Sequence, residues 1–160
     1  MMMSMNKLVF IMLGVIALVS CGNNDAFKND YIVCFKNANA MTTDLALQLI
    51  KEYGKDAHWE TTGDLIQTKL DSIVRVAYKP LVEKYGEKYI VEFFDRNLYK
   101  NEKGKYSKEE IEEYMMATID GFYYNERLGC SAMLFTMAKG DIMKARDYQN
   151  NAIQEVRLFN

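Results

Sequence analysis

The sequence has few of the residues from which metal sites and many enzyme active sites are built. Its 160 residues include one histidine, His58, and three cysteines, Cys21, Cys34 and Cys130. A structural zinc site normally needs four cysteine or histidine ligands. The chain also lacks EF-hand spacing, a phosphate-binding glycine loop, a nucleophile elbow and a zinc-protease histidine pair. We therefore expect no cofactor and no bound metal, and the chain is a weak candidate for an enzyme.

Clustered positive charge is also missing. The chain has 20 basic and 22 acidic residues, for a formal net charge of −2. A nucleic-acid-binding protein would need a basic face, so nucleic acid is not expected as a partner.

Long apolar runs are scarce, and the longest lies near the amino end. The run from Leu8 to Val19 is broken only by Gly14, with Lys7 before it and Ser20 after it. A short basic region, an apolar stretch and a small residue are the three parts of an export signal. The run is too short to span a bilayer comfortably, because a membrane helix needs about 20 apolar residues.

The segment Leu18-Val19-Ser20-Cys21 resembles the lipobox of bacterial lipoproteins. The resemblance implies that the sulfur of Cys21 receives a diacylglycerol, that the chain is cut before Cys21, and that the new amine is acylated, commonly with palmitate. One acyl chain binds a membrane at only about 10⁴ M⁻¹, so stable attachment takes two or three. An ordinary signal peptide and an uncleaved hydrophobic anchor remain alternatives, and the resemblance covers the signal and anchor alone.

The expected organisation is a removed signal at 1–20, a lipidated anchor and tether at 21–30, and one domain at 31–160. The segment from Gly22 to Asp30 is polar and has no periodicity, so it is interpreted as a tether of at most about 30 Å. Cleavage would leave 140 residues with 19 basic and 22 acidic side chains, a net charge of −3. Gly22 is not the aspartate that retains many lipoproteins in the inner membrane. The resemblance therefore favours the outer membrane, with the face left open.

The remaining chain predicts a mainly all-α domain of five or six amphipathic helices. Residues 31–35 fit either a brief strand or a first helix. A helix over 45–53 would be capped by Thr42 or Thr43, and Gly54 would end it. The strongest apolar stripe covers 65–82, where Pro80 predicts a kink or a new helix near Lys79.

Later breaks are predicted from glycines and caps. Gly86 permits a break before a helix over 89–98, and residues 107–110 fit a capping box that starts the next helix. Gly129 is expected to interrupt that helix. Gly140 would end the following piece, and Asp141 would begin the last helix.

Two cysteines remain once Cys21 carries lipid. Cys34 and Cys130 would lie in a compartment where disulfides persist, so a bridge between them is one hypothesis. Two separately buried thiols are the other. His58 could act with Glu60 as a general acid, although a partly exposed loop histidine is the simpler interpretation.

Aromatic residues are abundant, with eleven tyrosines and eight phenylalanines. Phe122, Tyr123 and Tyr124 are consecutive, and at about 100° per residue they cannot all face one core. Tyrosine is favoured at protein interfaces, so Tyr123 and Tyr124 are the candidate partner surface. The alternative is that Phe122 and one tyrosine pack inside while the other tyrosine lies on the surface.

Together these patterns predict a lipid-anchored envelope protein whose helical domain binds a protein partner. An immunity or inhibitor lipoprotein against an envelope-targeting toxin is one narrower form, and a scaffold of an envelope complex is another. An envelope enzyme using His58 ranks last.

Overall fold

The computed structural model describes residues 5–54, 63–102 and 118–159, with side chains described in 24–54, 63–95 and 118–159. The described residues form five helices and no strand: α1 (Met5–Tyr53), α2 (Gly63–Tyr85), α3 (Glu87–Glu102), α5 (Ile119–Ala138) and α6 (Ile142–Leu158). The prediction of a single all-α domain is confirmed. Residues 31–35 belong to α1, so the alternative of a strand there is wrong.

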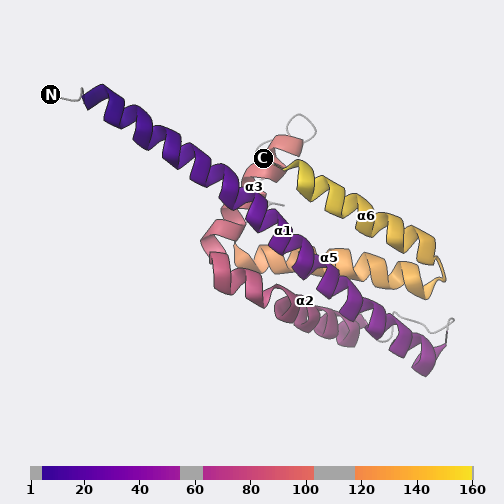
Figure 1. Cartoon of the computed structure of the whole chain (residues 1–160). Helices are drawn as coiled ribbons and strands as arrows, with labels where there is room; N and C mark the ends of the chain where they lie inside the picture. Colours follow the sequence, from indigo (N-terminus) through magenta and orange to yellow (C-terminus); the bar gives the residue numbers. More distant parts are fainter. Residues whose placement is uncertain (1–4, 55–62, 103–117, 160) are drawn as a thin grey trace.

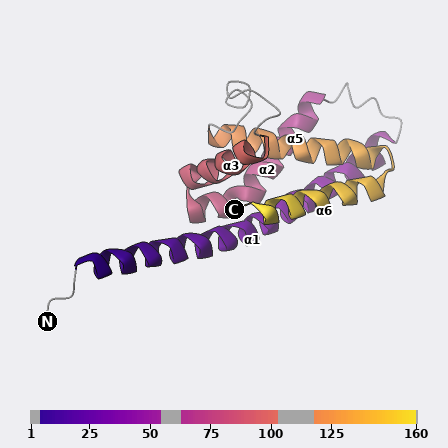
Figure 2. The same ribbon diagram turned by 90° about the horizontal axis from the view of Figure 1, so that it is seen from above.

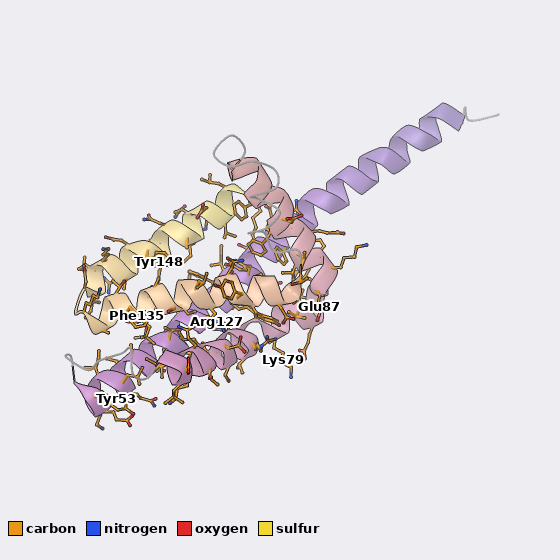
Figure 3. All side chains as sticks on the ribbon, turned by 180° about the vertical axis from the view of Figure 1, so that it is seen from behind. Tyr53, Lys79, Glu87, Arg127, Phe135 and Tyr148 are labelled. Atoms are coloured by element: carbon orange, nitrogen blue, oxygen red, sulfur yellow. The ribbon has the colours of Figure 1, made fainter. Side chains whose placement is uncertain are left out.

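The bundle is built on α1, which contacts α2, α5 and α6. Figure 1 shows α1 crossing the other helices, with its amino-terminal part extending away from them, and Figure 2 shows the same extension from above. Seen from the opposite side, α5 lies between α6 and α2 (Figure 3). Because α5 is covered by α1 on one side and flanked on two others, its inward face is the centre of the molecule.

The tether predicted before residue 31 is wrong for residues 24–30, which belong to α1. Phe27 is fully buried and lies against aromatic rings of α2 and α3, with its ring centroid 4.5 Å from that of Phe93. From Phe27 the buried positions of α1 recur at three- and four-residue steps: Phe27, Tyr31, Cys34, Ala38, Thr42, Leu45 and Leu49. Residues 24–30 contain only one large apolar side chain, so this stripe could not be recognised from the predicted tether alone.

The threonines predicted to cap a helix lie inside α1 instead. The hydroxyl of Thr42 donates to the carbonyl of Ala38 at 2.8 Å, and that of Thr43 donates to the carbonyl of Asn39 at 2.8 Å. A threonine hydroxyl that finds a carbonyl one turn earlier can be buried within a helix. No new helix therefore starts at this point.

The predicted helix ends at Gly54, Gly86 and Gly140 are confirmed. Gly140 has φ +82°, a conformation that residues with a Cβ rarely adopt, and its N–H donates to the carbonyl of Met137 at 2.8 Å. Asp141 then caps α6, because its carboxylate accepts from the N–H of Lys144 at 3.0 Å.

Two predicted helix breaks do not occur. Pro80 lies within α2, which continues to Tyr85, so no new helix starts near Lys79. The nearby Tyr78 and Leu81 are buried in the core. Gly129 lies within α5, where a Cβ at its position would be 3.4 Å from the hydroxyl of Tyr148 on α6. The glycine therefore lies where α5 meets a side chain of α6, and it does not break the helix.

The start of α5 also differs from the prediction. Thr118 caps it by accepting from the N–H of Gly121 at 3.1 Å, whereas the predicted capping box at 107–110 lies outside the described residues.

In the part of the chain that the structure describes, no helix is both long enough and apolar enough to cross a membrane.

Candidate functional site

The side chains of three residues that the sequence singled out are outside the described set. Cys21 lies in α1, but its side chain is outside the described set. His58 and Glu60 lie outside the described residues altogether. The lipid anchor and the histidine chemistry therefore stay predictions.

Cys34 on α1 and Cys130 on α5 are both buried free thiols, so the hypothesis of a bridge between them is wrong in this structure. Burial raises the pKa of the Cys130 thiol to about 11, and burial also raises the pKa of Cys34. A thiol that stays protonated is a poor nucleophile. These two cysteines act as small apolar core residues, which was the alternative left open by the sequence.

The aromatic triplet divides between core and surface. Phe122 is fully buried, and Tyr123 is only 8 % exposed, with the guanidinium of Arg75 4.7 Å from its ring centroid. Tyr124 is 52 % exposed. The prediction that Tyr123 belongs to a partner surface is therefore wrong, because α5 turns its ring toward α2, whereas Tyr124 is on the surface.

Tyr124 belongs to a strip along α5, which we call the α5 strip and define as the exposed Tyr124 and Leu128 and the half-buried Arg127. Leu128, one turn after Tyr124, is 46 % exposed, and the guanidinium of Arg127 lies 5.1 Å from the Tyr124 ring centroid. The Nε of Arg127 is buried and has no hydrogen-bond partner. Figure 3 shows Arg127 on α5, the helix that lies between α2 and α6.

The opposite side of α5 carries an acidic residue that the sequence analysis missed. Glu126 reaches into the core, where the hydroxyl of Tyr31 on α1 donates to its Oε1 at 2.9 Å and the hydroxyl of Tyr78 on α2 donates to its Oε2. One carboxylate thus joins three helices. Phe122 and Cys130 lie one turn away on either side and are both buried, so the four-residue spacing around Glu126 was the signal in the sequence.

Burial dominates the electrostatics of this cluster. It raises the pKa of Glu126 from 4.5 to about 7, although the hydrogen bonds from Tyr78 and Tyr31 act in the opposite direction. Burial, followed by the charge of Glu126, raises the pKa of both tyrosines well above the ordinary value. Glu126 can therefore gain or lose a proton near neutral pH while the two phenols stay protonated.

The groove that the structure describes between α1 and α2 is separate from the Glu126 cluster. This groove of about 350 Å³ is lined by residues from Met41 to Gln48 and from Lys69 to Ile73, and Glu126 does not line it. No group of three histidine, cysteine, aspartate or glutamate side chains that could hold a metal occurs among the described residues. The cluster can bind a proton and hold helices together.

Comparison of the chain with protein-family models, with curated proteins and with solved structures found no significant match. The function must therefore be argued from the residues and their geometry.

Proposed function

We propose that this chain is a lipid-anchored cell-envelope protein whose helical domain binds another protein. The observation that carries the binding proposal is the α5 strip. Tyrosine and arginine are the residue types that most often dominate binding energy at protein interfaces, and here they lie together beside an exposed leucine. The ring of Tyr124 against the guanidinium of Arg127 also orders both side chains before a partner arrives, which lowers the entropy cost of binding.

The guanidinium of Arg127, which lies over the ring of the exposed Tyr124, supports a partner that offers a hydrogen-bond acceptor. A partner carboxylate at the guanidinium would add charge-assisted hydrogen bonds there. We therefore propose that the partner presents an acidic side chain beside an apolar contact for Tyr124 and Leu128.

The anchor is proposed from the lipobox at Leu18-Val19-Ser20-Cys21, and the course of α1 supports it. Cleavage before Cys21 would remove residues from the part of α1 that extends away from the bundle (Figure 2). Phe27, six residues after Cys21, is already in the core. At 1.5 Å per helical residue this is only about 9 Å, so the lipid would hold the domain close to the membrane. The outer membrane is favoured because Gly22 follows the cysteine in place of an aspartate.

The proposal is tested by crosslinking in cells, followed by affinity purification of the tagged protein from envelopes. Tyr124→Ser is compared with the natural sequence and with Tyr53→Ser, because Tyr53 is 43 % exposed at the end of α1 and makes a matched control. Circular dichroism confirms that each variant is folded. We expect a specific partner that is retained by Tyr53→Ser and lost from Tyr124→Ser.

Other outcomes have defined meanings. A partner retained by Tyr124→Ser would contradict the α5 strip as the binding surface, and the absence of any specific partner would contradict the binding function. The identity of the captured protein separates the narrower forms. A secreted toxin would indicate an inhibitor, and a resident envelope component would indicate a scaffold.

A further inference from the structure

A cluster at the centre of the bundle consists of the carboxyl group of Glu126 and the hydroxyl groups of Tyr31 and Tyr78. No cation takes part in it among the contacts that the structure describes. Glu126 accepts from Tyr31 and Tyr78, and the hydroxyls of the two tyrosines also interact with each other. The rings of the tyrosines are packed, with centroids 5.5 Å apart. Both tyrosines lie in the core, at 5 % and 0 % exposure. The three groups therefore have only each other as polar partners among the contacts that the structure describes.

When Glu126 is protonated, the cluster can give a hydrogen-bond partner to each of its three groups. A neutral Glu126 can donate its proton to the oxygen of Tyr78, Tyr78 can donate to Tyr31, and Tyr31 can donate to the other oxygen of Glu126. Each group then donates one hydrogen bond and accepts one, and no net charge is buried. When Glu126 ionises, its two oxygens accept from two phenols, but a negative charge remains in the interior, where a charge without a counter-ion is costly.

The charged groups near the cluster do not supply that counter-ion. The titratable neighbours that sense the charge of Glu126 are neutral acids: Tyr31 and Cys34 on α1, Tyr78 on α2, Cys130 on α5 and Tyr148 on α6. The nearby cations have other contacts. Arg75 pairs with Asp71 and Asp120, and the guanidinium of Arg127 lies against Tyr124. No described side chain of α3 contributes to the pKa of Glu126.

We propose that Glu126 is a proton-binding site that ties α1, α2 and α5 together when it is protonated and loosens their packing when it ionises. The device is built from one carboxyl on α5 and two hydroxyls on different helices, so the gain or loss of one proton acts on three elements at once. The bundle is tightest in mildly acidic conditions and weaker above neutral pH. This inference does not depend on the identity of a partner.

The test uses the full chain purified from envelopes in detergent, with glutamate labelled by ¹³C at the carboxyl carbon. Carboxyl NMR follows the titration, and chemical denaturation follows stability at pH 5 and pH 8. Glu126→Gln removes the site, and Glu155→Gln on the exposed side of α6 is the matched control. Comparison of variants also separates Glu126 from His58, which stays in all of them.

We expect one carboxyl resonance that titrates near pH 7 in the natural sequence and in Glu155→Gln, and that is missing from Glu126→Gln. The unfolding equilibrium constant of the natural sequence should rise from pH 5 to pH 8 by roughly 50- to 100-fold more than that of Glu126→Gln. A Glu126 resonance that titrates below pH 5 would overturn the inference. So would an equal pH dependence in Glu126→Gln. If Glu126→Gln does not fold, Tyr78→Phe takes its place, and an unmoved carboxyl midpoint would then be the contradicting result.

Discussion

The hydroxyl of Tyr78 on α2 donates a hydrogen bond to the carboxylate of Glu126 on α5, and this contact joins two neighbouring helices through the core. The bond stabilises the ionised carboxylate, because it lowers the pKa of Glu126 against the effect of burial. Tyr78→Phe keeps the ring and removes the donor. We predict a higher pKa for Glu126, and a loss of stability that is larger at pH 8 than at pH 5.

Carboxyl NMR and denaturation at the two pH values measure these effects. The loss at pH 8 should be about 1.5 to 3 kcal/mol, the range for a hydrogen bond to a charged group. Tyr53→Phe on the exposed end of α1 is the control and should change neither quantity. An unchanged pKa in Tyr78→Phe would show that the hydroxyl does not act on the carboxyl.

The pH dependence has a definite sign. The pKa of Glu126 in the folded chain, about 7, is above the ordinary value of 4.5. Between these values the folded chain holds a proton that the unfolded chain has lost, so stability falls as the pH rises and levels off above the folded pKa. The total change is about 3 kcal/mol at most. Denaturation from pH 4 to pH 9 checks it, and stability that rises across this window in the natural sequence relative to Glu126→Gln would contradict the assignment.

Phe27 is the first core residue of the chain. Its ring centroid lies between 4.5 and 6.1 Å from those of Tyr85, Tyr89, Phe93 and Phe94. Phe27→Ala should lower the free energy of unfolding by about 3 to 5 kcal/mol, the range for a buried phenylalanine, whereas Asn29→Ala on the exposed side should cost less than 1 kcal/mol. Thermal denaturation distinguishes the two, and a chain insensitive to Phe27→Ala would restore residues 24–30 to the role of a tether.

Much of this architecture could be predicted from local patterns. The helix ends at Gly54, Gly86 and Gly140 and the cap at Asp141 follow from chemistry within a few residues of each end, and all four were predicted. The beginning of α1 could not be recognised in the same way. Phe27 is the one large apolar residue in a polar segment, and only its contacts with α2 and α3, more than fifty residues away, place it in the core.

The central cluster was missed for a related reason. Glu126 is an acid in a helix rich in apolar residues, and a solvated position is the ordinary expectation for glutamate. The hydroxyls that allow its burial come from Tyr31 and Tyr78, 95 and 48 residues away. Likewise, the sequence predicts that not all three rings of Phe122, Tyr123 and Tyr124 can face the core. The packing of α2 against α5 buries Tyr123 and leaves Tyr124 exposed.

Gly129 offers a test of the contact between α5 and α6. A Cβ at this position would be 3.4 Å from the hydroxyl of Tyr148, an ordinary contact with the end of a flexible side chain. Gly129→Ala should therefore stabilise the fold by about 0.5 to 1 kcal/mol, because alanine has the higher helix propensity. Gly129→Leu should destabilise it by separating the helices. Denaturation of both variants checks this, and a stabilising leucine would show that α6 does not pack closely here.

The free thiols give a prediction about redox state. Because Cys34 and Cys130 are unbridged and buried, a reductant should leave the melting temperature unchanged. A thiol reagent should modify Cys34 and Cys130 only slowly until the chain is unfolded. A bridge would constrain a long loop, worth about 4 to 5 kcal/mol in the chain-entropy model. A drop of several degrees on reduction would therefore contradict the free-thiol assignment.

The proposed function requires that lipid on Cys21 holds the helical domain at the membrane. The most direct test is the intact mass of the protein extracted from envelopes, combined with fragmentation of its amino-terminal peptide. We predict a chain that begins at Cys21 and carries a diacylglyceryl group with additional acylation, and we predict that Cys21→Ser abolishes this processing. A chain from the envelope that keeps residues 1–20, or one that begins at Cys21 without lipid, would contradict the proposal.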